Sequence, residues 1–187
     1  MSEDVFVHEK GICESDRVGK GTRVWAFAHV MKGAVVGEHC NVGECSFVEA
    51  GAVIGNHCTI KNGVSVWEKV TLEDYVFLGP NAVLTNDMLP RCRVKKGTEG
   101  FLPTLLKEGA TVGANATIVC GVTIGRNAMI GAGAVVTKDV PDHGLAFGNP
   151  ARVRGWVCEC GERMEPGAPC SCCGKLYKME GDRVVEA

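Results

Sequence analysis

The stretch VWAFAHVMKGAVVGEHCNVGECSFV, residues 24–48, has a valine at every sixth position. The same spacing of aliphatic residues extends from Ile12 to Leu84 and resumes from Leu106 to Val136. A period of six fits neither the turn of an α-helix, about 3.6 residues, nor the alternation of a simple strand. It predicts short strands separated by corners, three to a coil, which stack as an all-β solenoid.

The repeat also predicts which side chains are buried. Nineteen hexads make about six coils, and each coil should bury its aliphatic residues against neighbouring coils about 4.8 Å away. Glycine often follows the aliphatic residue, as at Gly113 and Gly131. At these positions a side chain would crowd either a neighbouring coil or a closely bound ligand.

Composition limits the domain organisation and the partners. The 187 residues predict one β-helix domain over 1–155 and a small cysteine-rich tail over 156–187. The 20 Lys and Arg residues nearly balance the 22 Asp and Glu residues, so we expect binding neither to nucleic acid nor to a membrane surface. Without an apolar run at the N-terminus, the chain is expected to be cytoplasmic.

One interruption breaks the repeat. Residues 85–105 contain TNDMLPR followed by a stretch rich in Lys, Gly and Glu, and the hexads return only at Leu106. A loop that leaves an otherwise regular solenoid is more often functional than accidental. We therefore expect the loop to take part in the active site.

The hexads resemble those of the hexapeptide-repeat acyltransferases, whose fold is a left-handed parallel β-helix. The resemblance implies a homotrimer in which the loop reaches a neighbouring subunit. The segments VGANATIVCGVTIGRNAMIGAGAVVTKDVP and FGNPARVRGW resemble the end of the acetyl-CoA-dependent members, in which the pantetheine arm lies along the final coils between two subunits.

This resemblance implies a set of residues that bind coenzyme A. Small residues would expose backbone groups to the amide-rich arm, and cations would neutralise the phosphates. The expected residues are Gly113, Gly131, Ala132, Gly133, Lys138 and Arg152. The alternative is that the small residues only permit close packing of coils and that the cations are ordinary surface charge.

Further stretches, VWAFAHV, IKNGVSVWEKVTLED, FLGPNAVLTND and NPARVRGWVCECG, resemble a narrower group. These are the nucleotide-sugar 3-N-acetyltransferases, which acetylate a 3-amino group on a UDP- or dTDP-linked hexose or hexuronic acid for the synthesis of surface polysaccharide such as lipopolysaccharide. In that group an asparagine matching Asn86 lies beside the thioester and the sugar, and no protein base is credited. A sugar amine is partly neutral near pH 7 and can attack directly when it is well positioned.

The expected acceptor site follows from this resemblance and from the register of the coils. The substrate-binding residues are expected to be Asn86, Asp87, Arg91, His29, Glu68 and Lys61, with Asn86 as the catalytic residue. Glu68 should lie one coil below Asn86, where it is either an acid, base or sugar-binding group or a solvated corner carboxylate. His29 should lie three coils from Asn86, about 14 Å away, too far for contact within one subunit.

The tail carries its own pattern. Cys158-x-Cys160-Gly and Cys170-Ser-Cys172-Cys173-Gly resemble the two knuckles of a zinc ribbon, which implies a structural zinc ion held by Cys158, Cys160, Cys170 and Cys173. The alternative is four free or oxidised thiols. The six cysteines of the body are expected to be small buried side chains.

Three other functions remain open. A γ-type carbonic anhydrase needs three well-placed histidines, two of them about five residues apart, and no such pair is found in the sequence. An O-acetyltransferase acting on another small acceptor would require a base. A solenoid used only as a scaffold would bind no coenzyme A. Whether the nucleotide is UDP or dTDP stays open, although the tail favours UDP.

Overall fold

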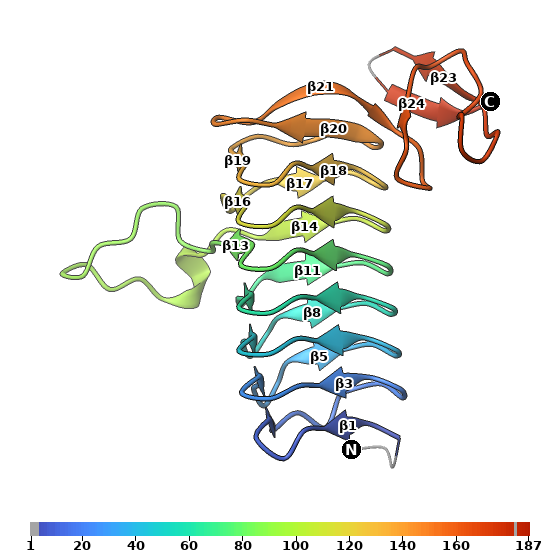
Figure 1. Ribbon diagram of the computed structural model, residues 1–187. Helices are drawn as coiled ribbons and strands as arrows, with labels where there is room; N and C mark the ends of the chain where they lie inside the picture. The colour runs from blue at the N-terminus through green and yellow to red at the C-terminus, as the bar shows by residue number, and fades with distance from the viewer. Residues whose placement is uncertain (1–3, 182) are drawn as a thin grey trace.

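The chain folds as a parallel β-helix, seen in a computed structural model that describes residues 4–181 and 183–187 (Figure 1). Strands of mostly two residues follow one another around a three-sided coil. Val24 pairs in parallel with Val42, and Val42 pairs with Ile60, so successive turns lie 18 residues apart. In Figure 1 the near strands run right to left and the far strands left to right as the chain rises, which makes the coil left-handed.

Three sheets form the three sides of the solenoid, and one hairpin belongs to the tail. The first sheet contains β1 (Phe6–Val7), β3 (Arg23–Val24), β6 (Asn41–Val42), β9 (Thr59–Ile60), β12 (Phe77–Leu78), β15 (Thr111–Val112), β18 (Met129–Ile130), β20 (Gly144–Phe147), β21 (Arg152–Val157) and β22 (Arg163–Met164). The second contains β2 (Ile12–Cys13), β4 (His29–Val30), β7 (Phe47–Val48), β10 (Ser65–Val66), β13 (Val83–Leu84), β16 (Thr117–Ile118) and β19 (Val135–Val136). The third contains β5 (Val35–Val36), β8 (Val53–Ile54), β11 (Val70–Leu72), β14 (Thr104–Leu106) and β17 (Thr123–Ile124). The tail hairpin pairs β23 (Tyr177–Glu180) with β24 (Arg183–Glu186).

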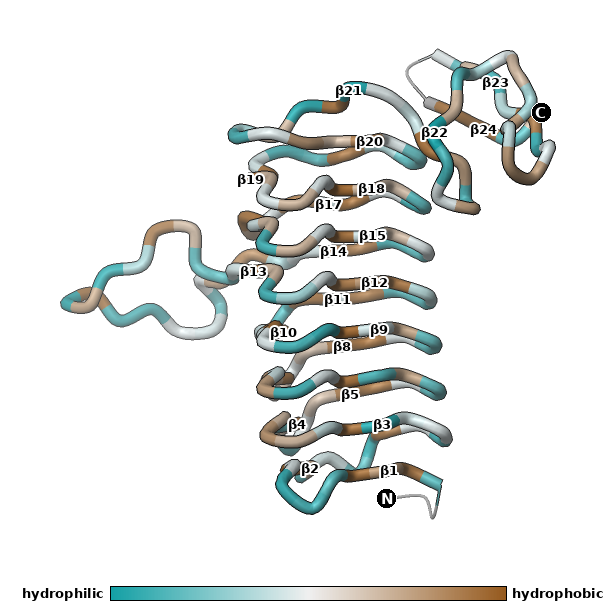
Figure 2. The backbone as a smooth tube through the Cα atoms, viewed as in Figure 1, coloured by the Kyte–Doolittle hydropathy of each residue, from teal (hydrophilic) through white to brown (hydrophobic). Residues whose placement is uncertain are grey.

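The residue at every sixth position points into the solenoid, as the sequence predicts. From Val18 to Val136 these aliphatic residues form a single buried cluster, together with most of the small residues four positions later. Figure 2 shows hydrophobic residues concentrated along the strands and hydrophilic residues at many of the corners. Because each turn lies directly over the next, an aliphatic residue packs against its counterparts above and below, and no turn is stable alone.

Two expectations about the repeat are wrong. Ile12 is 53% exposed, and it is Cys13 that stands in register with the buried Val30. The reason is that Cys13 and Val18 are five positions apart rather than six, so the first turn is one residue short and the pattern shifts to the other face. The described residues also make about eight turns rather than six, because irregular turns at both ends stack on the regular ones (Figure 1).

The interruption is a loop that leaves the solenoid after β13 and returns at β14 (Figure 1). Leu72 pairs with Leu106, so the register across the insertion steps by 34 residues in place of 18 and is otherwise preserved. Within the loop lies a short 3-10 helix, η1 (Thr98–Gly100). The coil geometry is thus unchanged by the insertion, and the loop projects from one corner.

The last turn is covered by an antiparallel hairpin. β20 continues the first sheet in parallel, whereas β21 returns against it and runs across the predicted domain boundary between residues 155 and 156. In the described part of the chain, no helix is long and apolar enough to cross a membrane.

The prediction that body cysteines are buried holds for Cys40, Cys58 and Cys120. It is wrong for Cys45, at an outward corner, and for Cys92, on the loop.

Candidate active site

The predicted acceptor and cofactor residues lie around the second sheet. The first corner, between the first and second sheets, carries Lys61, Gly113 and residues 131–133. The second corner, between the second and third sheets, carries Glu68, the loop and Lys138. His29 lies between the two corners on the outer face of β4. Residues from hexads far apart in sequence therefore lie at the two corners that flank the second sheet.

Asn86 lies at the base of the loop, where the chain leaves the solenoid. Its carbonyl accepts a hydrogen bond of 2.9 Å from the N–H of Leu102, which joins the outgoing and returning strands of the loop. Beside it, the hydroxyl of Thr85 accepts a 2.9 Å hydrogen bond from the N–H of Cys120. Lys69 also donates to the Phe101 carbonyl at 3.2 Å. The half-buried Asn86 is thus held against the coil rather than carried on the exposed part of the loop.

Beyond this base the loop has its own polar framework. The Asp87 carboxylate accepts hydrogen bonds from Lys96 Nζ at 2.6 Å and from the Leu89 N–H at 2.9 Å. The Lys96 ammonium, more than the Leu89 N–H, holds the pKa of Asp87 below its usual range. This carboxylate, predicted to bind substrate, organises the loop. Arg91, at the far end, is exposed beside an isolated bridge to Val94.

The coil below the loop has the predicted register. Ser65 pairs with Val83, which places Trp67 under Thr85 and Glu68 under Asn86. The Trp67 indole donates a 2.8 Å hydrogen bond to the Leu84 carbonyl, just before the loop begins. The half-buried Glu68 therefore borders the base of the loop.

His29 lies toward the N-terminal end of the second sheet, where its side chain contacts a carboxylate and an aromatic ring. Its Nε2 lies 3.2 Å from a Glu14 carboxylate oxygen, and this contact lowers the pKa of Glu14. Its ring contacts the edge of Phe47 with centroids 5.6 Å apart. β4 and β13 are separated by β7 and β10, so His29 and Asn86 are three strands apart, as the sequence predicts.

Two of the predicted coenzyme A glycines are required by the packing of adjacent turns, and a third glycine is not. A Cβ on Gly113 would lie 2.5 Å from the Ala132 backbone nitrogen, and a Cβ on Gly131 would lie 2.8 Å from Phe147 Cβ. These two glycines allow adjacent turns to approach. Gly133 differs, because a Cβ there would have no described atom within 4 Å. Gly133 has a left-handed backbone conformation, with a φ of 68°, and Asn115 has the same conformation one turn earlier, with a φ of 57°. Gly133 therefore leaves open space at the first corner.

A cavity of about 500 Å³ lies next to these residues. It is lined by Gly131 and Ala132, by Phe147 of β20, and by residues Gly161 to Arg163 of the tail. Arg163 also lines a neighbouring cavity with Arg154.

Arg154 and Arg163 were not predicted from the sequence, although the cations of RVRGW were visible. Arg154 Cζ lies 5.5 Å from the centroid of the Phe147 ring. Arg152, which was predicted, is exposed, bonds the Ala151 carbonyl at 2.8 Å and does not line either cavity. The pattern of strands in the sequence cannot show that the tail folds back and places Arg163 at the same cavity as Arg154.

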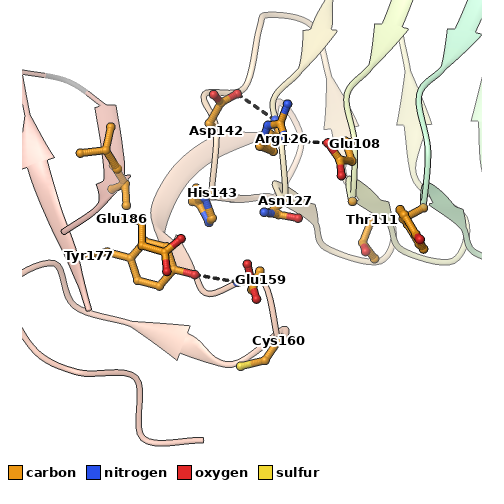
Figure 3. Close-up of a pocket in the computed structure, with 14 residues that line it drawn as sticks. Glu108, Thr111, Arg126, Asn127, Asp142, His143, Glu159, Cys160, Tyr177 and Glu186 are labelled. Atoms are coloured by element: carbon orange, nitrogen blue, oxygen red, sulfur yellow. Dashed lines mark hydrogen bonds and ion pairs between the residues drawn. The ribbon is translucent and has the colours of Figure 1, made fainter. Parts of the chain in front are cut away.

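A larger cavity, about 810 Å³, lies where the tail meets the corner between the third and first sheets (Figure 3). Its carboxylates already have partners. The Arg126 guanidinium pairs with Glu108, and the backbone N–H of Arg126 donates a 2.8 Å hydrogen bond to the Asp142 carboxylate. His143 packs against Tyr177 with ring centroids 5.0 Å apart and joins the tail to the solenoid. This cavity contains none of the predicted acceptor or coenzyme A residues, so we do not assign the reaction to it.

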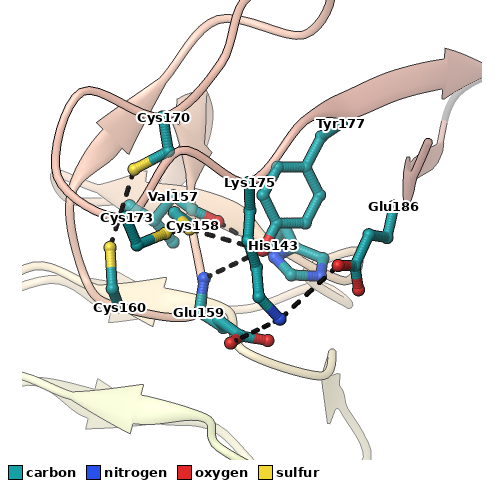
Figure 4. Close-up of polar contacts among 10 residues, drawn as sticks. All are labelled: His143, Val157, Cys158, Glu159, Cys160, Cys170, Cys173, Lys175, Tyr177 and Glu186. Carbon is teal, nitrogen blue, oxygen red and sulfur yellow. Dashed lines mark hydrogen bonds and ion pairs between the residues drawn. The ribbon is translucent and has the colours of Figure 1, made fainter.

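The four tail cysteines singled out by the sequence converge. The Sγ atoms of Cys158, Cys160, Cys170 and Cys173 all lie within 4.8 Å of one another (Figure 4). Within one copy, and among the residues that the structure describes, this is the one group of three or more metal-ligating side chains.

Comparison with known proteins agrees with this fold. The family model described as bacterial transferase hexapeptide (six repeats) matches residues 17–50, 51–86 and 103–138. The chain is 48% identical over 180 residues to the dTDP-3-amino-3,6-dideoxy-alpha-D-galactopyranose 3-N-acetyltransferase of Aneurinibacillus thermoaerophilus, covering 95% of this chain and 92% of that protein. It is also 32% identical over 147 residues to the bifunctional protein GlmU of Thermosynechococcus vestitus, covering 79% of this chain but only 30% of that protein.

Solved structures share the fold at low sequence identity. The UDP-N-acetylglucosamine acyltransferase from Campylobacter jejuni superposes with a TM-score of 0.59 at 17% identity, covering 82% of this chain and 68% of that one. The acetyltransferase domain of PglB from Neisseria gonorrhoeae, solved in complex with acetyl coenzyme A, has a TM-score of 0.50 at 24% identity, covering 81% and 55%. The chain belongs to the bacterial hexapeptide-repeat transferase family and is an acyltransferase.

Proposed function

We propose that the chain transfers the acetyl group of acetyl-CoA to the 3-amino group of a nucleotide-linked amino sugar. The observation that carries this proposal is the 48% identity, over 95% of the chain, to a dTDP-3-amino sugar 3-N-acetyltransferase. That relative favours a dTDP-linked sugar over the UDP-linked one that the tail alone suggested. Its similarity extends across the loop and the last coils, where the candidate site lies.

The chemistry needs positioning more than a strong base. The neutral amine nitrogen attacks the thioester carbonyl carbon, the C–N bond forms, and the C–S bond then breaks. Coenzyme A leaves as a thiolate and takes up, through solvent, the proton that the amine loses. The side-chain amide of Asn86 orients the reacting groups, because its backbone is fixed to the returning loop at Leu102.

The cofactor is proposed to lie along the first corner of the last coils. Gly133 offers open space there, and the cavity beside Gly131 has an apolar side at Phe147 and a cation, Arg163, at its rim. We add Arg154 and Arg163 to the proposed phosphate contacts, since both line adjoining cavities.

We propose a homotrimer, the assembly that the family resemblance implies, and the geometry supports contact between copies. The first corner lies at the start of the strands of the second sheet, and the loop lies at their end. One copy therefore does not bring Asn86 directly beside Gly133. The loop also exposes Met88, Leu89 and Val94, which are 46%, 72% and 60% exposed. Apolar side chains on a projecting loop are suited to covering a second copy. In the proposed assembly, the loop of one copy faces the last coils of the next.

The test is a thiol-release assay with acetyl-CoA and 3-amino-3,6-dideoxy sugars linked to dTDP or UDP, with the product identified by mass. We expect N-acetylation with a dTDP-linked acceptor. Asn86→Ala should lower kcat about 100-fold, the usual effect of losing one positioned donor. Absence of thiol release with every 3-amino sugar would refute the proposal, and acetylation of a hydroxyl would replace it with O-acetyl transfer.

A matched pair of variants tests the cofactor placement separately. Gly133→Asn should fold normally, because Asn81 and Asn115 hold the same left-handed conformation, with φ of 56° and 57°, on earlier turns. Its side chain fills the open corner, so we expect KM for acetyl-CoA to rise at least tenfold, about 1.4 kcal/mol. The control, Asn115→Gly, should leave KM nearly unchanged. If Gly133→Asn leaves KM at the wild-type value, coenzyme A lies elsewhere.

A further inference from the structure

We propose that the tail binds a structural zinc ion through Cys158, Cys160, Cys170 and Cys173. Two Sγ pairs are close: Cys158 and Cys173 at 3.4 Å, and Cys160 and Cys170 at 3.6 Å (Figure 4). Zn–S bonds of about 2.3 Å in a tetrahedron place sulfur atoms about 3.8 Å apart. Four sulfurs that all lie within 4.8 Å of one another are close enough to share one such ion.

The first pair of cysteines has the backbone of a metal knuckle. Gly161 follows the pair with a φ of 90°, and its N–H donates to the Cys158 carbonyl at 2.9 Å. This tight turn brings the Glu162 N–H near the Cys160 sulfur. The Tyr177 hydroxyl lies 3.3 Å from Cys158 Sγ. Hydrogen bonds of this kind orient metal ligands.

The second pair repeats the arrangement. Gly174 follows it with a φ of 75°, and its N–H donates to the Cys170 carbonyl at 2.9 Å. The backbone N–H groups of Cys172 and Cys173 lie near the Cys170 sulfur, and that of Lys175 lies near the Cys173 sulfur. Two turns that each end in a glycine of positive φ thus bring the four sulfurs into a single site.

The tail is too small to hold this arrangement by packing alone. Its buried cluster consists of five residues, two of which are the cysteines Cys158 and Cys170, with Trp156 packed against it. Segments of this size usually need a metal or cross-links to fold. Four protein ligands leave no open coordination position, so the ion is structural rather than catalytic.

The site also fastens the tail to the rest of the protein. Cys158 directly follows β21, and residues 161–163 line the 500 Å³ cavity beside Gly131. Loss of the metal should therefore increase hydrogen exchange in residues 158–175 while leaving the solenoid coils protected. This readout does not depend on acetyl transfer, so the zinc proposal and the proposed function can fail separately.

The first experiment measures metal content by mass spectrometry on protein purified without chelating resin. We expect about one zinc ion per chain, as in other closed four-cysteine sites. Cys158→Ser and Cys170→Ser should lose it, whereas the matched control Cys172→Ser should keep it, because Cys172 stands between two ligands but outside the cluster. Iron in place of zinc, no bound metal, or equal loss in Cys172→Ser would overturn the assignment.

A second experiment uses wild-type protein, in case the serine variants do not fold. Alkylation of native protein should modify the exposed Cys45, Cys92 and Cys172, and should reach Cys160 and Cys173 only after a strong chelator is added. Cobalt exchange should produce the absorption bands of a tetrahedral thiolate site. If Cys160 and Cys173 are alkylated as fast as Cys172, or if the intact mass shows disulfides, the proposal is wrong.

Discussion

Two buried threonines should respond in opposite directions to the same substitution. Thr104 is 1% exposed, and its hydroxyl has no hydrogen-bond partner among the residues that the structure describes. It lies in a column between Val70 and Val122 on adjacent turns. Thr22 is equally buried, but its hydroxyl donates to the Gly37 carbonyl at 2.7 Å and accepts from a backbone N–H at 2.9 Å.

The magnitudes follow from these contacts. An unpaired buried hydroxyl costs about 1–3 kcal/mol, so Thr104→Val, which keeps the shape, should raise the free energy of unfolding by about 1–2 kcal/mol. For a chain of this length that is about 2–4 °C in Tm per kcal/mol. Thr22→Val leaves the Gly37 carbonyl and the Cys40 N–H without that partner, and should lower the free energy of unfolding by about 1–3 kcal/mol.

The assay is thermal and urea unfolding followed by far-UV circular dichroism. Wild type and both variants must be compared at equal chain concentration, because the stability of an oligomer depends on concentration. A Thr104→Val protein that melts at or below the wild-type temperature would refute the reasoning. So would a shift of both variants in the same direction, since the argument rests on the difference in their hydrogen bonds.

Two further predictions concern the loop and the coil contacts. The lowered pKa of Asp87 means that its pair with Lys96 is present at neutral pH and is lost as the pH falls through that pKa. Asp87→Asn, which mimics the protonated form, should speed tryptic cleavage at Arg91 at pH 7 with no change in Tm; unchanged cleavage would contradict the structural role of this pair. Gly113→Ala should lower the free energy of unfolding by about 1–3 kcal/mol, because its Cβ would meet the Ala132 backbone, and an unaltered Tm would show that the turns can separate.

The proposed position of the active site is consistent with the way a solenoid uses its sequence. Each hexad contributes an inward residue that fixes the coil and outward residues that are free to vary. The loop can therefore be inserted between β13 and β14 without disturbing the register of Leu72 and Leu106. The site that we propose lies where the repeat is broken, at the loop and at the end of the coil.

Much of the fold was predictable from the sequence, because burial in a β-helix is set by a fixed period. The aliphatic residues at steps of six, from Val18 to Leu84 and from Leu106 to Val136, are buried as predicted. The prediction failed at Ile12, since a turn shorter by one residue moves side chains to the opposite face. The convergence of the four tail cysteines was also predictable, because paired cysteines followed by glycine are typical of the knuckles of a zinc ribbon.

What the sequence could not decide was the surroundings of chemically identical residues. Gly113 and Gly133 are the same residue in the same repeat, yet a Cβ would collide with the next turn at Gly113 and meet open space at Gly133. Arg163 borders the cavity beside Gly131 because the tail folds back, and this approach leaves no periodic signal. A repeat determines contacts between neighbouring turns, since these recur every 18 residues; contacts made by a loop or a tail depend on a path through space that only the tertiary structure defines.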